Sequence, residues 1–185
     1  AKKYGVQLVV RSSLNNNEGT IVREEVNMEK MLVSGVAADK NATRIAVIGL
    51  KDEPGIAFHL FNALAKYNIN VDIILQSVGR NGTKDISFTV AEDEADEAVA
   101  IIQKSFPKSE YNKIDEEKDV AKISIVGAGM MTHPGVAASM FEALYDAGVN
   151  IKMISTSEIR VTVLIDEKYT ERALNAVHDK FALGD

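Results

Sequence analysis

The sequence lacks cysteine altogether, which excludes disulfides, thiolate zinc sites and cysteine nucleophiles. A chain without cysteine fits a reducing compartment, so we expect a cytoplasmic location. Long apolar runs are also absent, because stretches such as 44–50 and 151–154 fall far short of the ~20 residues that a membrane-spanning helix requires. The three histidines lie at no metal-ligand spacing. We therefore expect neither a membrane segment nor a metal site.

An excess of positive charge is absent as well. The chain carries 21 Lys and Arg against 27 Asp and Glu, a formal net charge of -6. This balance argues against the basic surface with which proteins bind nucleic acid. Hydrophobic residues make up 46% and charged residues 26%, which is typical of a folded globular chain. The first residue is Ala1 rather than Met and no signal-peptide hydrophobic region follows, so we expect a processed or excised fragment.

An internal repeat organises what is present. Asp52-Glu53-Pro54-Gly55 is echoed by Thr132-His133-Pro134-Gly135, and segment 68–74 is echoed by 148–154, both at an offset of 80 residues. Further along, the first copy carries seven additional residues. They fall in the Gly- and Asn-rich stretch 79–84, which predicts an exposed turn. The chain therefore contains two copies of one structural unit.

Each copy has the hydrophobic pattern of strand, helix, strand, strand, helix. In the first copy we expect strands over 42–50, 71–75 and 85–90, and a final strand near 112–114. The second copy ends one strand short. Its expected elements are strands over 122–126, 150–156 and 158–165 and helices over 136–147 and 169–181. This order predicts an α+β fold of two ferredoxin-like βαββαβ modules, each an antiparallel sheet with its helices on one face.

The repeat also predicts the domain organisation. Residues 1–41 belong to neither copy and form a lead-in segment, a linker with first strand elements in which 28–36 adds a strand or a short helix. Residues 42–115 form the first module, and residues 116–185 form the second. Each module is about seventy residues long, a size at which a core is marginal by itself, so we expect sheets or chains to pair.

The repeat resembles ACT modules, small amino-acid-binding units in which an acid-x-Pro-Gly turn follows the first strand, as in 52–55. Several further motifs occur in the order found in the C-terminal half of aspartate kinases, and together they cover essentially the whole chain. They are Arg11-Ser12-Ser13, Gly19-Thr20, Gly35-Val36-Ala37, Leu75-Gln76, Val126-Gly127-Ala128-Gly129-Met130, His133-Pro134-Gly135 and Ile154-Ser155-Thr156-Ser157-Glu158-Ile159.

The resemblance implies the regulatory region, or separate small subunit, of an aspartate kinase, with tandem ACT domains. Aspartate kinases transfer phosphate from ATP to the carboxylate of aspartate with an N-terminal catalytic domain that opens with a Lys-Phe-Gly-Gly-type loop, and this sequence contains no such loop. The chain alone is thus not expected to be an enzyme or to hold a cofactor, because ATP and Mg would belong to the catalytic domain. The stretch before Met28 resembles the tail of that domain.

The Pro-Gly turns are the candidate binding sites. Gly55 and Gly135 each open an expected helix, and the unpaired N–H groups of a helix N-terminus favour an anion such as an amino-acid carboxylate. Asp52 is then the candidate partner for the ligand's ammonium group. The alternative is structural: Pro-Gly makes a tight turn and Asp52 caps the helix.

The resemblance extends these turns into two effector sites. Asn70 and Asn150 begin corresponding strands, where each either serves a local turn or lines a site facing the partner chain. The first site, for threonine, comprises Asp52, Pro54, Gly55, Ile56, Ala57, Val71, Gln76, Asn150 and Ile151. The second site, a candidate for lysine, comprises Thr132, His133, Pro134, Gly135, Ala137, Asn70, Ser157 and Glu158.

Two departures weaken the lysine site relative to the threonine site. Thr132 replaces the acid of the first copy, and Ala137 stands where some lysine-inhibited members carry a hydroxyl. Glu158 either pairs with a lysine side chain or is a solvated charge at a strand end. The sequence Gly127-Ala128-Gly129 is not a dinucleotide-binding fingerprint, since the third glycine position is Thr132 and a seventy-residue unit is too small.

The resemblance implies allosteric feedback inhibition by an end-product amino acid, threonine first and lysine next. We expect a homodimer through the ACT modules, with the first module of one chain beside the second of the other, that works with a catalytic domain or alpha subunit. Two alternatives remain: a ligand-independent platform for dimerisation and assembly, and a fragment with catalytic capacity.

Overall fold

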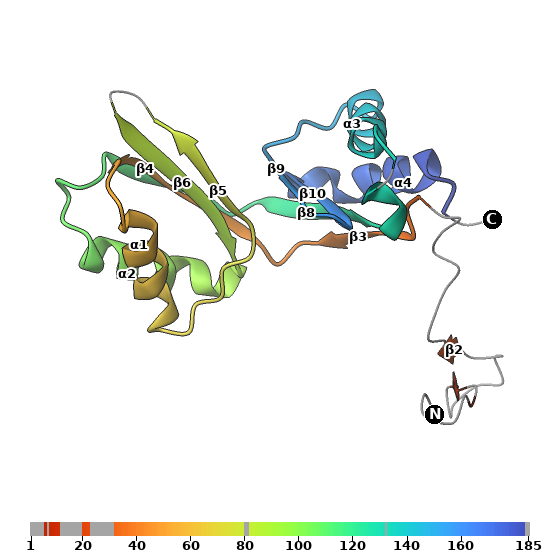
Figure 1. Cartoon of the computed structure of the whole chain (residues 1–185), viewed down its shortest axis with the longest axis horizontal. Coiled ribbons are helices and arrows are strands. Elements are labelled where there is room, and N and C mark those ends of the chain that lie inside the picture. The colour runs from red at the N-terminus through yellow and green to blue at the C-terminus, as the bar shows by residue number, and fades with distance from the viewer. Residues whose placement is uncertain are drawn as a thin grey trace.

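The chain folds into two α+β modules that lie next to each other along the long axis of the molecule (Figure 1). The computed structural model describes residues 6, 8–11, 20–22, 32–79, 82–131 and 133–183. Each module contains a four-stranded antiparallel sheet and two α-helices. The predicted class, two ferredoxin-like modules of antiparallel sheet and helices, is confirmed.

The first module has the order βαββαβ. Its sheet has the strand order β5-β6-β4-β7, so the first strand of the module, β4, lies inside the sheet and β5 lies at an edge. A short 3-10 turn, Glu92–Glu94, precedes its second helix. The elements are β4 (Thr43–Lys51), α1 (Ile56–Ala65), β5 (Ile74–Val78), β6 (Thr83–Val90), α2 (Ala95–Ser105) and β7 (Lys113–Glu117).

The second module repeats this arrangement with the strand order β3-β8-β10-β9. Its edge strand β9 therefore corresponds to β5 of the first module. Short 3-10 turns over Ala128–Met131 and Glu167–Tyr169 precede its two helices. The elements are β8 (Val120–Val126), α3 (Val136–Asp146), β9 (Met153–Thr156), β10 (Arg160–Asp166) and α4 (Thr170–Lys180).

The fourth strand of the second module comes from before the first module. Strand β3 (Gly35–Asp39) pairs antiparallel with β8, from Gly35 opposite Val126 to Asp39 opposite Lys122. The interpretation that residues 1–41 belong to neither copy is therefore wrong for β3. The physical reason is the open edge of β8, whose backbone N–H and C=O groups need a ladder partner. Similarly, β7 runs to Glu117, beyond the boundary predicted at residue 115.

Gly127 allows the segment before β3 to approach closely. A Cβ at Gly127 would lie 2.4 Å from the backbone oxygen of Leu32 and 2.8 Å from the Cα of Val33. Both neighbours are backbone atoms, so neither can turn aside. The first glycine of the Gly-Ala-Gly sequence is therefore required by packing within the module, in agreement with the rejection of a dinucleotide fingerprint.

Three clusters of buried residues hold the structure together. One lies between the sheet and helices of the first module and contains Phe88, while another lies in the second module and contains Met140. A third, small cluster joins the modules: Ala42 and Ile73 from the first, Val120, Met153 and Leu164 from the second. The modules thus share an apolar junction.

The strands that follow α1 and α3 begin later than the sequence predicted. β5 starts at Ile74 rather than at residue 71, and β9 starts at Met153 rather than at residue 150. Before β5 the backbone still bonds to Thr89 of β6, because the Asp72 N–H donates to the Thr89 carbonyl and the Thr89 N–H donates to the Ile73 carbonyl, both at 3.0 Å. The Thr89 hydroxyl also accepts a hydrogen bond from the Ile73 N–H at 3.1 Å. Apart from these modules, β1 (Leu8–Val10) and β2 (Thr20–Val22) form a two-stranded antiparallel sheet.

Candidate functional site

The two Pro-Gly turns have the same backbone conformation. Gly55 has φ 96° and ψ -11° at the start of α1, and Gly135 has φ 97° and ψ -6° at the start of α3. Such a positive φ is open to glycine and strained for other residues. Space is not the reason for glycine, because a Cβ at Gly55 would come no closer than 3.7 Å to the His59 ring. The repeat in sequence is therefore also a repeat in backbone geometry.

Each turn exposes the N-terminus of a helix. The first N–H groups of an α-helix have no acceptor within the helix, and the helix dipole places partial positive charge there. No side chain of the described residues caps α1 or α3. The alternative interpretation, in which Asp52 caps the helix, is therefore wrong. Both turns can receive a carboxylate from solvent.

Asp52 pairs with Lys84, a residue that the sequence analysis did not identify. The Lys84 ammonium lies 2.8 Å from the Asp52 carboxylate, and their side chains are 27% and 47% exposed. Lys84 lies in β6 directly opposite Leu50 of β4, which brings it to the end of the strand that leads into the turn. A ligand ammonium that binds Asp52 would therefore share the carboxylate with Lys84.

The remaining residues of the first predicted site are divided between the modules. Ile56 and Ala57 form the half-buried first turn of α1, beside exposed Pro54. Exposed Gln76 of β5 stands opposite buried Ile86 of β6, so both side chains leave the same face of the sheet. Val71 lies half-buried before β5. In contrast, Asn150 and Ile151 precede β9 in the second module.

The second predicted site is divided in the same way. His133 and Pro134 are exposed at the start of α3, and Ala137 is half-buried in its first turn. Ser157 and Glu158 are exposed in the turn between β9 and β10, where the Ser157 N–H donates to the Arg160 carbonyl at 2.8 Å. Asn70 belongs to the first module. Thr132 lies outside the described residues.

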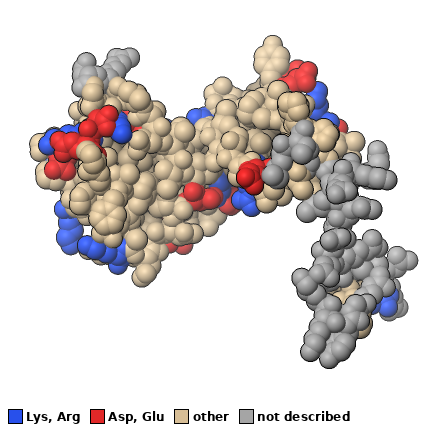
Figure 2. Space-filling model, in the orientation of Figure 1, with Lys and Arg blue, Asp and Glu red and all other residues tan. Residues whose placement is uncertain are grey.

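Two pockets lie where the modules meet. One, of about 400 Å³, is lined by the predicted site residues Asn70 and Val71 together with Asp72 and, from the second module, Lys122. The other, of about 340 Å³, combines residues 72–74 with residues 155–157 and Arg160. Figure 2 shows a notch between the modules on the face in view. The predicted residues next to Asp72 therefore adjoin the junction.

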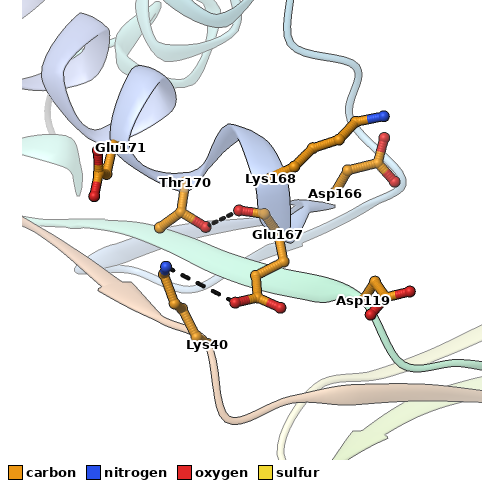
Figure 3. Close-up of a pocket in the computed structure, with 7 residues that line it drawn as sticks. All are labelled: Lys40, Asp119, Asp166, Glu167, Lys168, Thr170 and Glu171. Atoms are coloured by element: carbon orange, nitrogen blue, oxygen red, sulfur yellow. Dashed lines mark hydrogen bonds and ion pairs between the residues drawn. The ribbon is translucent and has the colours of Figure 1, made fainter.

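A further pocket of about 650 Å³ lies at the start of α4, away from the Pro-Gly turns (Figure 3). Lys40 reaches into it and lies 3.8 Å from the Glu167 carboxylate. The Thr170 hydroxyl donates to the Glu167 carbonyl at 2.6 Å, a local contact that fixes the start of the helix. The pocket contains none of the predicted site residues. It is lined by Lys40, Asp119, Asp166, Glu167, Lys168, Thr170 and Glu171.

Ion pairs cross the junction between the modules, where Figure 2 shows charges of both signs side by side. Lys122 of β8 lies 2.8 Å from Asp39 of β3 and 2.7 Å from Asp72 of the first module. Glu117 of β7 accepts hydrogen bonds from Arg44 of β4, at 3.0 Å, and from Lys152 of the second module. The Lys122 side chain is only 13% exposed, so its charge depends on these partners.

The charges at the junction stabilise one another. Burial alone raises the pKa of Glu117, but hydrogen bonds from Lys152 and Arg44 outweigh it and hold the pKa below the ordinary 4.5. Burial lowers the pKa of Lys122, but hydrogen bonds to two carboxylates outweigh it and raise the pKa above 10.5. Burial likewise raises the pKa of Asp39, and the hydrogen bond from Lys122 outweighs it and lowers the pKa. The pKa shifts of Glu117, Lys122 and Asp39 therefore all favour the charged form.

Acid should weaken the junction. A carboxylate whose folded pKa is depressed contributes stability above its unfolded pKa, and loses it as the pH falls through the folded pKa. The ordinary pKa of Glu117 is 4.5, so we expect the stability contributed by this carboxylate to be lost below pH 4.5. Stability should change little through the neutral range. Urea unfolding between pH 3 and 7, roughly the span over which carboxylates titrate, measures it. Glu117→Gln should reduce the acid-induced loss, whereas Glu97→Gln, on the exposed face of α2, should not; equal pH profiles would contradict the assignment.

Two classes of site are absent from the described part of the chain. No cluster of metal-ligating side chains occurs among the described residues. Within the same residues, no helix is both long and apolar enough to cross a bilayer.

The two modules define a class of protein. A family profile described as "ACT domain" matches residues 45–106 and 123–181. Each matched range covers three strands and both α-helices of one module, including the glycine at the start of the first helix. The molecule is thus a pair of ACT domains, one of which takes the fourth strand of its sheet from before the other.

Similarity to known proteins assigns this pair of ACT domains to one protein family. The chain is 44% identical to an aspartokinase of Helicobacter pylori over 99% of its own length and 46% of the relative's. It is 46% identical, with a TM-score of 0.74, to a chain in the structure of aspartokinase alpha and beta subunits, covering 82% of this chain and 99% of that one. For the ligand-free regulatory subunit of aspartate kinase from Thermus thermophilus the identity is 42%, the TM-score 0.75 and the coverage 81% and 99%. The chain belongs to the aspartokinase family, as its regulatory ACT part, and spans about half the length of the curated relatives it matches.

Proposed function

We propose that the chain binds an end-product amino acid at its Pro-Gly turns and thereby controls an aspartokinase by feedback inhibition. The observation that carries this proposal is the matched pair of left-handed glycines, Gly55 and Gly135, each at the open N-terminus of a helix. Threonine is the first candidate ligand and lysine the second. Transfer of phosphate from ATP, with Mg, to aspartate is assigned to the catalytic part of the enzyme, with which this chain would assemble.

The chemistry of the first site suits threonine. The helix N-terminus at Gly55 offers N–H donors to the carboxylate, and Asp52 offers an acceptor to the ammonium group. Gln76, exposed on the helix-bearing face of the sheet, is available to the ligand hydroxyl. At the second site the helix N-terminus is the same, and Glu158 is the group that suits the side-chain ammonium of lysine.

Dimerisation is the second part of the proposal. The sheets end in the edge strands β5 and β9. All five residues of β5 are exposed, and three of them, Ile74, Leu75 and Val78, are large and apolar. Proteins normally cover an apolar edge strand. We propose that a second chain covers β5. The first module of one protomer then lies beside the second module of its partner, and the site residues that are divided between the modules come together.

Control of the kinase then follows from linkage. A ligand that binds one arrangement of the dimer better than another shifts the population toward that arrangement by its difference in affinity. Because the chain is the regulatory part, the arrangement favoured by the end product is the one in which the catalytic part is less active.

Removal of Asp52 should weaken threonine binding. Loss of a charge-assisted hydrogen bond typically costs about 1.5–3 kcal/mol, so Asp52→Ala should raise the dissociation constant roughly 10- to 100-fold. Isothermal titration calorimetry measures it, with Asp96→Ala as the control, since Asp96 is an exposed aspartate paired with Lys118 on another face. Equal threonine affinity in both variants would contradict the site, and no binding by the unaltered chain would contradict threonine as the effector.

A ligand-independent assembly platform is the second candidate function. It is favoured by one observation: Asp52 already has a cationic partner in Lys84, so the turn is electrostatically satisfied without a ligand. In that case the dimer forms, but neither threonine nor lysine produces a heat of binding. The same titration, carried out with both amino acids, therefore separates the two functions.

A further inference from the structure

The ion pairs of the junction follow the internal repeat. Arg44 faces Glu117 across the β4–β7 ladder, and Lys122 faces Asp39 across the β8–β3 ladder. Lys122 follows Arg44 by 78 residues, and Glu117 follows Asp39 by the same 78. The strand that precedes the first helix of each module, β4 or β8, thus carries a cation opposite an anion on the strand that completes its sheet, β7 or β3. The junction therefore has two equivalent halves.

A third charge joins each half from the opposite module. Asp72 and Lys152 are 80 residues apart, the offset that relates the two copies, but they carry opposite charges. Asp72, before β5 of the first module, pairs with Lys122 of the second. Lys152, before β9 of the second module, pairs with Glu117 in the sheet of the first. Each half contains a cation and an anion. The acidic Asp72 binds the cation of one half, Lys122, and the basic Lys152 binds the anion of the other half, Glu117.

These two crossing residues directly follow the predicted ligand-binding segments. Residues 70–71 precede Asp72, and residues 150–151 precede Lys152. The next residue in each case, Ile73 or Met153, is buried in the apolar cluster that both modules share. A displacement of segment 70–71 or 150–151 therefore also moves the adjacent charged residue, Asp72 or Lys152, which is ion-paired with the other module.

The free energy of folding alone does not account for the two ion pairs that cross the junction, Asp72–Lys122 and Lys152–Glu117. Lys122 keeps Asp39 as a partner if Asp72 withdraws, and Lys152 keeps Asp166, at 2.9 Å within its own module, if Glu117 withdraws. Because each lysine keeps a second carboxylate, loss of its pair with Asp72 or Glu117, which are 54% and 30% exposed, should cost little of the free energy of folding. What Asp72 and Lys152 do specify is how each site segment is positioned against the opposite module.

We propose that Asp72 and Lys152 are positioning residues that couple the two ligand sites of one chain through the junction between the modules. This inference rests on the proposed amino-acid binding and deepens it. Occupation of one site fixes its segment and, through the crossing ion pair, fixes the orientation of the other module. Neither residue needs to touch the ligand.

The test uses the 185-residue chain with Asp72→Asn, Lys152→Met and the double substitution, which remove charge and keep side-chain size. The matched control is Lys180→Met, because Lys180 pairs with Glu142 at 2.7 Å between α4 and α3 of one module, away from the junction. Two quantities are measured: the calorimetric thermal-unfolding profile without ligand, and the titration with threonine alone and then with lysine after threonine.

We expect the unaltered chain and the control to unfold in one cooperative transition and the double variant to unfold in two. In the titrations, the effect of one amino acid on the affinity for the other, typically about 5- to 150-fold for coupled sites, should disappear in the double variant while each separate affinity is retained. A single transition and unchanged coupling in the double variant would overturn the inference. Split unfolding with no binding of either amino acid by any variant would support the junction and overturn the effector proposal alone.

Discussion

Charges placed on the exposed edge strand should turn the proposed dimer into a monomer. Ile74 and Leu75 are adjacent in β5, so their side chains leave opposite faces of the sheet. In the proposed dimer a partner covers both faces of this edge. Burial of a large apolar side chain is worth about 1.5–3 kcal/mol, so Ile74→Lys with Leu75→Lys should weaken dimerisation at least ~100-fold. Sedimentation equilibrium of the double variant and of the unaltered chain measures it.

The control for this experiment keeps the same added charge at another exposed apolar surface. Tyr67→Lys with Tyr145→Lys alters residues that are 48% and 81% exposed, at the end of α1 and on α3. Their substitution should leave the dimer intact. Dissociation in this control, with a dimer retained in the β5 variant, would move the interface from the edge strands to the helices. Monomers of the unaltered chain at every concentration would refute dimerisation itself.

The sequence predicted those parts of the fold that are encoded locally. Apolar alternation and helical spacing identified the strands and helices of both copies, and the motif offset identified their equivalence. Strand β3 was beyond this method, because its partner β8 lies more than eighty residues further along and only the open edge of that strand selects it. Asp72 and Lys152 escaped for a related reason. Their roles depend on how two modules meet, which no pattern within one module records.

The backbone of the two candidate turns was predicted to a similar extent, whereas the binding roles of the site residues stay a prediction. The turns at Gly55 and Gly135 followed from the repeated Pro-Gly pair, and their matched left-handed backbones agree with it. The Lys84 partner of Asp52 did not follow, because the Gly- and Asn-rich stretch 79–84 predicts a turn at residue 84, whereas β6 already begins at Thr83. A strand extended by two residues brings the lysine to the carboxylate, and this extension depends on pairing with β4 rather than on composition.

Truncation of Phe88 should be the most destabilising single change in the first module. Phe88 of β6 is fully buried and lies opposite Ile45 of β4 on one side and Ile74 of β5 on the other. Its ring meets Phe61 of α1 edge-to-face, with the centroids 5.5 Å apart. Phe88→Ala therefore removes contacts to three elements, two of which, α1 and β5, carry the first candidate site. A phenylalanine-to-alanine change in a core typically costs about 3–5 kcal/mol.

Urea unfolding followed by far-ultraviolet circular dichroism measures this loss, since the chain has no tryptophan to report by fluorescence. Phe58→Ala is the matched control, because Phe58 lies on α1 with 65% of its surface exposed, and substitutions at such positions usually change stability by about 0.5 kcal/mol or less. Phe88→Leu, which keeps most of the volume, should remain folded with an intermediate stability. In Phe88→Leu the edge strand β5 loses its contact with the Phe88 ring. Weaker dimerisation and ligand binding in this variant, with intact secondary structure, would show that packing of the core positions the site. Equal stability of Phe88→Ala and Phe58→Ala would contradict the central place of Phe88 in the packing.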